Sequence, residues 1–326
     1  MRRRAFILGF GAAAAWPLPA CPQEPGRIYR IGFLIPSPRD RPPVAAMFDE
    51  LRLNGFIEGQ NLVVIPGGFG VPVDAIAERA LALVRAAPDV IVAGPELQLR
   101  ALQAITRTVP LVGMTEDMVA EGLVASLARP GGNITGISLL SPELDGKRQD
   151  ILIDAVPGIK RVGALADSNV TPPRHLEELK DAARLRGLDL VNVGVARPQE
   201  VVPAIKAAKE WGAQALNLLA TPLFSVPGTP TNRLVLDTLA ELRLPAIFQW
   251  PETAELGGLI GYGPRFTQMY RQRAQMVVKV LRGAKPPDLP IEQPTRFELV
   301  INLKAAKAIG HEVPAGLVLR ADEVIE

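Results

Sequence analysis

From residue 30 onward, short apolar runs alternate with longer stretches that have the spacing of amphipathic helices. The apolar runs in the first part of the chain lie at 31–35, 62–65, 90–93 and 109–114. The helical stretches between them lie at 44–56, 73–86 and 96–106. Strands that are apolar almost throughout are typical of a parallel sheet covered on both faces. The pattern therefore predicts right-handed βαβ crossovers and a doubly wound α/β sheet.

The same order of elements returns in the middle of the chain. Predicted strands lie at 162–166, 188–195, 215–219 and 244–248. They alternate with predicted helices at 172–186, 199–211 and 231–243. In both sets the third strand ends beside a proline, at Gly94-Pro95 and at Thr221-Pro222. We therefore expect two similar, Rossmann-like α/β lobes.

Three segments are predicted to join the lobes as a hinge. A strand at 133–140 leaves the first lobe, and a strand at 257–263 returns to it ahead of a helix at 265–282. The proline-rich segment 283–294 then crosses again, into a strand at 297–303. Lobe 1 is expected to comprise 28–137 and 253–288, and lobe 2 to comprise 138–252 and 289–326. Three short crossings would allow rigid-body closure around a ligand.

Length and charge agree with this organisation. A chain of 326 residues exceeds the usual size of one hydrophobic core, so two domains are expected. The formal net charge is +2, but without Arg2, Arg3 and Arg4 the balance is 33 basic against 34 acidic residues. Because phosphate neutralisation needs a basic face, we expect no nucleic-acid partner.

Residues 1–20 have the pattern of an export signal peptide. Arg2, Arg3 and Arg4 precede an apolar run at 6–16 that is too short to span a bilayer. Twin-arginine and Sec export both fit. Cys21, the only cysteine, follows directly, and Leu18-Pro19-Ala20-Cys21 resembles a lipobox, in which the cysteine is acylated. The alternative is an unmodified, inert thiol.

Signatures of enzymes and metal sites are missing from the sequence. The two histidines, His175 and His311, lie far from any nucleophile motif and are expected at a solvated helix start and in a C-terminal turn. There is no G-x-S-x-G elbow, P-loop or G-x-G-x-x-G motif. One cysteine and two distant histidines cannot build a closed zinc site. We expect no catalytic residue, no cofactor and no metal.

The predicted fold indicates where a ligand would bind. In open α/β sheets, ligands lie beyond the carboxyl ends of the strands, and two facing lobes would line one cleft with such ends. Each residue at these ends has the alternative role of helix cap or turn. Trp250 could supply an apolar wall. The residues expected in the cleft are Ser37, Pro95, Glu96, Thr115, Glu116, Asp117, Asn169, Thr221, Gln249 and Trp250.

Several long runs carry a family resemblance. They include the sequence from Leu53 to Asn61, the sequence from Gly122 to Gly136, and Gln293 to Ala308. These runs resemble the TrpX-like group of ABC transporter substrate-binding proteins, and the resemblance covers essentially the whole chain. It implies the type I periplasmic-binding fold and a monomer that captures a small organic ligand, either amino-acid-like or another small amine or aromatic compound.

The resemblance also implies partners and location. The ligand would be delivered to an ABC permease and its ATPase, and the protein would be periplasmic or exported. It would touch the membrane only through an anchor at Cys21. An exported ligand sensor for a membrane receptor and a two-domain α/β enzyme are the alternative interpretations.

The chain departs from the family pattern where the ligand is expected. Gly94-Pro95-Glu96 replaces Gly-Thr-Pro, Thr115-Glu116-Asp117-Met118 replaces a turn like Ser-Asp-Pro, and Asp167-Ser168-Asn169 replaces Asn-Pro. If Glu96, Glu116 and Asp117 face the cleft, they would favour a ligand with an amine or another positive group.

Overall fold

The first lobe is built on a five-stranded parallel sheet with the strand order β2-β1-β3-β4-β5. A computed structural model describes residues 26–139 and 141–326 of the chain, so the predicted signal peptide and Cys21 lie outside the described residues. The strands are β1 (Tyr29–Leu34), β2 (Leu62–Val64), β3 (Val90–Ala93), β4 (Leu111–Thr115) and β5 (Ile134–Ser138). Every described strand pair in this sheet is parallel, as predicted.

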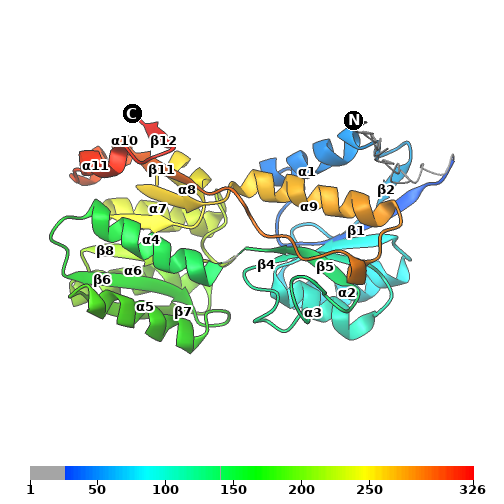
Figure 1. The fold of residues 1–326 in the computed structure, drawn as a ribbon, viewed down its shortest axis with the longest axis horizontal. Helices are drawn as coiled ribbons and strands as arrows, with labels where there is room; N and C mark the ends of the chain where they lie inside the picture. The colour runs from blue at the N-terminus through cyan, green and yellow to red at the C-terminus, as the bar shows by residue number, and fades with distance from the viewer. Residues whose placement is uncertain (1–25, 140) are drawn as a thin grey trace, which may run out of the picture.

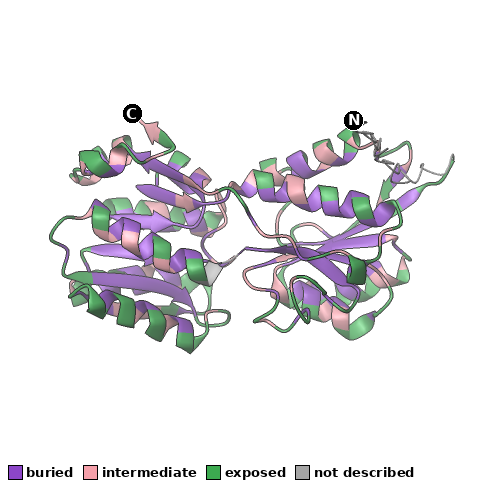
Figure 2. Ribbon diagram, viewed as in Figure 1, coloured by how far each residue is buried: buried purple, intermediate pink, exposed green. Residues whose placement is uncertain are grey.

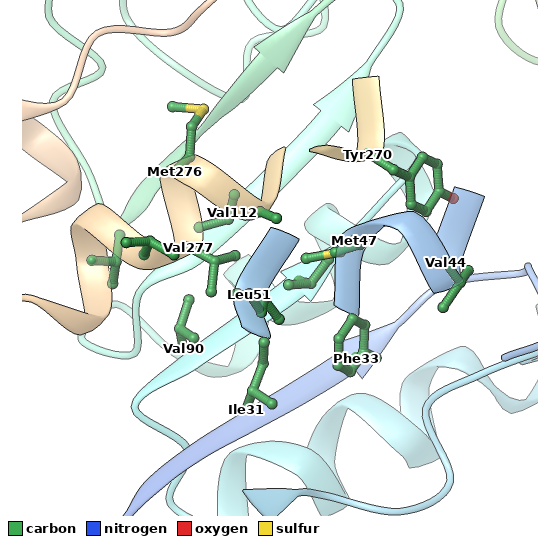
Figure 3. Close-up of a cluster of buried hydrophobic side chains, with 14 of the residues drawn as sticks. Ile31, Phe33, Val44, Met47, Leu51, Val90, Val112, Tyr270, Met276 and Val277 are labelled. Carbon is green, nitrogen blue, oxygen red and sulfur yellow. The ribbon is translucent and has the colours of Figure 1, made fainter. Parts of the chain in front are cut away.

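Helices cover both faces of this sheet (Figure 1). Helices α2 (Ile76–Arg85) and α3 (Glu96–Ile105) pack on one face. Helices α1 (Pro42–Leu53) and α9 (Phe266–Leu281) pack side by side on the other. Figure 3 shows Met47 and Leu51 of α1 and Val277 of α9 above Ile31, Phe33 and Val90 of the strands. Helix α9 therefore belongs to the core of the first lobe although it is distant in sequence.

The second lobe contains a seven-stranded sheet with the order β12-β11-β10-β9-β8-β6-β7. Its pairs are parallel except for the antiparallel pair β10–β11. The strands are β6 (Arg161–Asp167), β7 (Asp189–Val195), β8 (Ala215–Leu218), β9 (Ala246–Phe248), β10 (Ile260–Gly263), β11 (Glu298–Asn302) and β12 (Glu323–Ile325). Figure 2 shows buried strands between helices whose outer faces are exposed.

Helices cover both faces of the second sheet as well. Helices α4 (Ser141–Ala155) and α5 (Pro173–Leu185) share one hydrophobic cluster with it, and α6 (Val201–Trp211) and α7 (Pro230–Glu241) share another. The short helices are α8 (Pro251–Glu255), α10 (Leu303–Ile309) and α11 (Ala315–Val318). Two doubly wound α/β lobes, as predicted from the apolar pattern, are confirmed.

The lobe boundaries differ from the expected ones at the second and third crossings. The strand expected to return to the first lobe, β10, pairs instead with β9 and β11 in the second sheet. It remains there because β9, α8 and β10 form one more parallel crossover, with Ile260 in the core of the second lobe. The chain returns only at 264–265, just before α9. The third crossing is also later, since Glu292 still bridges to Ile137 of β5.

His175 is buried, contrary to the expected solvated position. Only 8% of its surface is exposed, and its Nε2 lies 3.0 Å from Oδ2 of Asp145 on α4. The same carboxylate accepts a hydrogen bond of 2.6 Å from Nη2 of Arg148. The sequence prediction did not include α4, so it lacked the partner that draws His175 inward. His311 lies just after α10, as expected, and its Nε2 lies 2.9 Å from the Ala155 carbonyl.

Candidate functional site

A cavity lies between the lobes at the carboxyl ends of their strands. It has a volume of about 50 Å³. Both sheets and the second crossing contribute to its walls, since Phe266 and Tyr270 at the start of α9 line it together with strand-end residues. Seven of the ten predicted cleft residues line this cavity, namely Ser37, Pro95, Thr115, Glu116, Thr221, Gln249 and Trp250.

The first-lobe wall depends on a tight approach between two strand ends. Gly94 has φ +142°, and a Cβ atom there would lie 2.6 Å from the Met114 carbonyl oxygen. Only glycine therefore allows the turn after β3 to lie against the end of β4. The turn continues through a cis peptide bond into Pro95. This approach places Pro95 beside Thr115 and Glu116 in the cavity wall.

The second-lobe wall is held by hydrogen bonds among strand ends. The Thr221 hydroxyl donates to Oδ2 of Asp167 at 2.7 Å, joining the end of β8 to the end of β6. Gln249 follows β9, and its Nε2 donates to Oε2 of Glu116 at 3.1 Å, which is a direct link between the lobes. Its Oε1 is buried and has no hydrogen-bond partner in the described part of the chain. An amide acceptor is therefore available at the cavity.

Three predicted residues do not line the cavity. Glu96 forms an ion pair with Arg100 one turn along α3, with Oε1 2.6 Å from Nε. Asp117 accepts hydrogen bonds from the backbone N–H groups of Val119 and Ala120, so it has the turn role named as its alternative. Asn169 donates to Asp167 and to the Ala196 carbonyl. The expected acidity of the cleft is thus reduced to Glu116.

Arg273 of α9 is a cavity residue that the sequence did not predict. Its side chain is buried, with 1% of the residue exposed, and its guanidinium donates to the carbonyls of Val112 and Ala93. Burial lowers the pKa of Arg273 to about 10, so the group stays charged at neutral pH. Helix α9 was predicted, but strand-end reasoning cannot show which helical side chain reaches a cleft.

Aromatic side chains form the apolar part of the cavity. The rings of Trp250 and Phe266 lie 4.6 Å apart, and those of Phe266 and Tyr270 lie 5.1 Å apart in an edge-to-face arrangement. The Tyr270 hydroxyl is 3.5 Å from the Ser37 hydroxyl. The lining thus combines one wall of aromatic rings with a few polar groups, a composition typical of small-molecule sites, whereas the volume of about 50 Å³ is smaller than that of such sites.

Glu121 lies behind the first-lobe wall. Burial raises its pKa to about 7, and the neighbouring carboxylates of Glu96 and Glu116 add to the rise. A hydrogen bond of 3.2 Å from the Asp117 backbone N–H to Oε1 of Glu121 lowers the pKa and so acts in the opposite direction. A carboxyl that titrates near neutral pH therefore lies close to the cavity.

Two larger hollows lie elsewhere. One of about 750 Å³ is lined by Arg265 and by second-lobe residues such as Glu252 of α8 and Glu298 of β11, and one of about 800 Å³ lies at the end of the first lobe beside Arg27 and Lys285. Neither is formed by strand carboxyl ends, so the smaller interlobe cavity is the better candidate. Among the described residues, no cluster of His, Cys, Asp or Glu could hold a metal ion, and no helix is long and apolar enough to cross a membrane.

Comparison with protein families decides the family of this chain. The family model described as ABC transporter substrate binding protein matches residues 72–325. The chain belongs to this family. Among its relatives is the tyrosine-binding protein of Clostridioides difficile (strain R20291), which is 25% identical over 232 residues. That alignment covers 68% of this chain and 63% of the relative, so the chain spans less than two thirds of the relative's length.

Solved structures with the same fold support the architecture of this substrate-binding protein. A conserved domain protein from Vibrio cholerae matches with a TM-score of 0.78 at 24% identity, covering 91% of this chain and 99% of that one. The ABC domain in complex with L-Trp from Streptococcus pneumonia matches with a TM-score of 0.78 at 22% identity, covering 91% and 100%. The predicted family and the type I periplasmic-binding fold are confirmed.

Proposed function

We propose that this substrate-binding protein captures a small organic molecule between its lobes and delivers it to an ABC importer. The observation that carries the proposal is the interlobe cavity, whose walls are the strand ends of both sheets joined by the Gln249–Glu116 hydrogen bond. A molecule held there contacts both lobes at once, so binding and lobe closure are coupled. Desolvation and a few fixed polar groups supply the affinity, and no covalent chemistry is needed.

The chemistry of the cavity supports an amino-acid-like or aromatic ligand. Trp250, Phe266 and Tyr270 offer ring faces, and Glu116 and Gln249 offer polar contacts. Two relatives are named for such ligands, one as a tyrosine-binding protein and one as a complex with L-Trp. The turns at Pro95 and Glu116 differ from the family pattern, so the ligand of this chain is to be identified from the protein itself.

The partners and location follow from the same proposal. The protein acts as an exported monomer that docks on an ABC permease with its ATPase. Acylation of Cys21 tethers it to the membrane. If so, the wild type fractionates with membranes and Cys21→Ala fractionates with the soluble exported proteins. Equal fractionation of the two forms would leave the free, unmodified thiol as the correct interpretation.

Ligand recovery tests the proposed function. The protein is purified from its native host under non-denaturing conditions, and bound molecules are identified by native mass spectrometry. Uptake of the recovered compound is then compared in host cells with and without this protein. An unchanged compound together with lost uptake supports import. A compound that is consumed supports the enzyme alternative, and a bound compound with unaltered uptake supports the sensor.

A further inference from the structure

Arg273 carries a buried positive charge without an acidic partner among the described residues. Its Nε lies 3.3 Å and its Nη2 3.0 Å from the Val112 carbonyl oxygen, and Nη2 also donates to the Ala93 carbonyl. No carboxylate of the described chain lies within ion-pair distance of it. Arg148, which is also buried, differs because it pairs with Asp145. Burying a charge that is not paired is costly, so this arrangement calls for an explanation.

The unpaired charge lies at the interlobe cavity. Arg273 lines it together with Tyr270 of the same helix, whose ring centroid lies 6.0 Å from the guanidinium carbon. Within the described residues Arg273 donates hydrogen bonds through Nε and Nη2, and Nη1 makes none. The carbonyls of Ala93 and Val112 hold one side of the planar group in place. A fixed guanidinium edge then remains for a ligand.

We propose that Arg273 is the anion-binding group of the cleft and that the ligand binds through a carboxylate on this guanidinium. This inference rests on the proposed function and names the ligand's chemistry. A carboxylate matches the planar fork of donors, and charge-assisted hydrogen bonds of this kind are about twice as strong as neutral ones. The desolvation of the arginine is already complete in the folded protein, so it does not oppose binding.

Glu116 limits which anions fit. It is the carboxylate that lines the same cavity, so a doubly charged group such as phosphate would meet repulsion that a single carboxylate largely avoids. Glu116 also favours a ligand whose other end is neutral or positive. Arg273 and Glu116 thus change the earlier expectation of an acidic cleft selective for amines. They predict that a ligand needs a carboxylate in order to bind and that an amine at its other end strengthens binding further.

Charge-matched compounds test the inference. The probes are L-tyrosine, 3-(4-hydroxyphenyl)propionate, which lacks the amine, and tyramine, which lacks the carboxylate. Sodium acetate against sodium chloride at equal ionic strength is a minimal carboxylate probe. Thermal shift and calorimetry are carried out at pH 7.5. We expect stabilisation of the wild type by the carboxylates and by acetate, and binding of tyramine at least 30-fold weaker than that of L-tyrosine.

Variants assign the effect to one side chain. Arg273→Gln retains an N–H donor for the strand carbonyls but loses the charge, and it should reduce carboxylate affinity at least 30-fold and abolish the acetate effect. Arg273→Lys retains the charge and should keep part of the binding. Arg271→Gln removes the same charge from the same helix at a position that does not line the cavity, and it should bind like the wild type. Circular dichroism confirms that each variant is folded.

The outcomes separate this inference from the proposed function. Tyramine binding as tightly as the carboxylates, no stabilisation by any carboxylate, or unchanged affinity in Arg273→Gln overturns the role of Arg273. A recovered natural ligand without an anionic group also overturns it, although import would still stand. Carboxylate binding that depends on Arg273, in a protein whose loss leaves uptake unaffected, supports the anion site and contradicts import.

Discussion

The raised pKa of the Glu121 carboxyl makes the stability of the protein depend on pH. Burial raises its pKa to about 7, whereas an unfolded chain releases the proton near pH 4.5. Between these values the folded state holds a proton that the unfolded state has lost, so stability falls as pH rises and the loss is complete above about pH 7. At pH 8 the free energy of unfolding of Glu121→Gln should therefore be about 1–2 kcal/mol higher than that of the wild type. At pH 4.5 the two proteins should have the same free energy of unfolding.

Urea unfolding at both pH values measures this difference. Glu241→Gln removes an exposed carboxylate at the end of α7 and is the matched control, for which no pH-dependent change is expected. A Glu121→Gln variant with the wild-type stability at pH 8 would show that this carboxyl ionises in the folded protein without cost.

Gly136 in β5 is a second residue that matters for stability, because the backbone there leaves no room for a Cβ atom. Its φ is +149°, and a Cβ atom would lie 2.1 Å from the Gly113 carbonyl oxygen on β4. Gly136→Ala should lower the thermal midpoint of the first lobe, with a loss of about 2–3 kcal/mol from the clash and the strained backbone. Gly132→Ala, with open space around its Cβ position, should leave it unchanged. Similar melting of the two variants would contradict this reasoning.

At the scale of elements, α1 and α9 together complete the core of the first lobe. Met47 is fully buried between α1 and the sheet, whereas Leu53 at the end of the same helix is 70% exposed. Met47→Ala should cost about 2–4 kcal/mol of unfolding free energy because it leaves a cavity, and Leu53→Ala should cost less than about 0.5 kcal/mol. Chemical denaturation measures both. Equal effects would mean that the core is not packed as in Figure 3.

The same elements show what the sequence could and could not predict. Continuous apolar runs located β3 at its observed bounds and indicated a parallel sheet in each lobe, but they did not specify the strand order or the antiparallel pair β10–β11. Helix α4 was missed because it buries Asp145, Arg148 and Gln149 and so lacks a clear apolar stripe. Strand β10 was found but assigned to the wrong lobe, since its apolar pattern does not specify its neighbour. Arg273 was missed because an arginine on an amphipathic helix usually lies in solvent.

At the scale of the whole molecule, two hydrogen bonds between described residues join the lobes near the cleft. Besides Gln249–Glu116, Arg41 before α1 donates from Nη2 to the Pro227 carbonyl of the second lobe at 3.2 Å. Arg41 does not line the cavity, so it affects a ligand only through the position of the lobes. A hydrogen bond that exists only when the lobes are close stabilises the closed state relative to the open state by about 0.5–1.5 kcal/mol, the net free energy of such a bond in water.

Arg41→Ala should therefore open the ligand-free protein and weaken binding of the recovered ligand about 3- to 10-fold, because the ligand must supply the lost closure energy. Small-angle scattering should show a larger radius of gyration without ligand and the wild-type value with it. Arg39→Ala is the control, since Arg39 contacts Glu58 and the Phe48 ring within the first lobe. If Arg41→Ala binds and scatters like Arg39→Ala, the Arg41–Pro227 contact does not contribute to closure, and other interlobe contacts such as Gln249–Glu116 hold the lobes together.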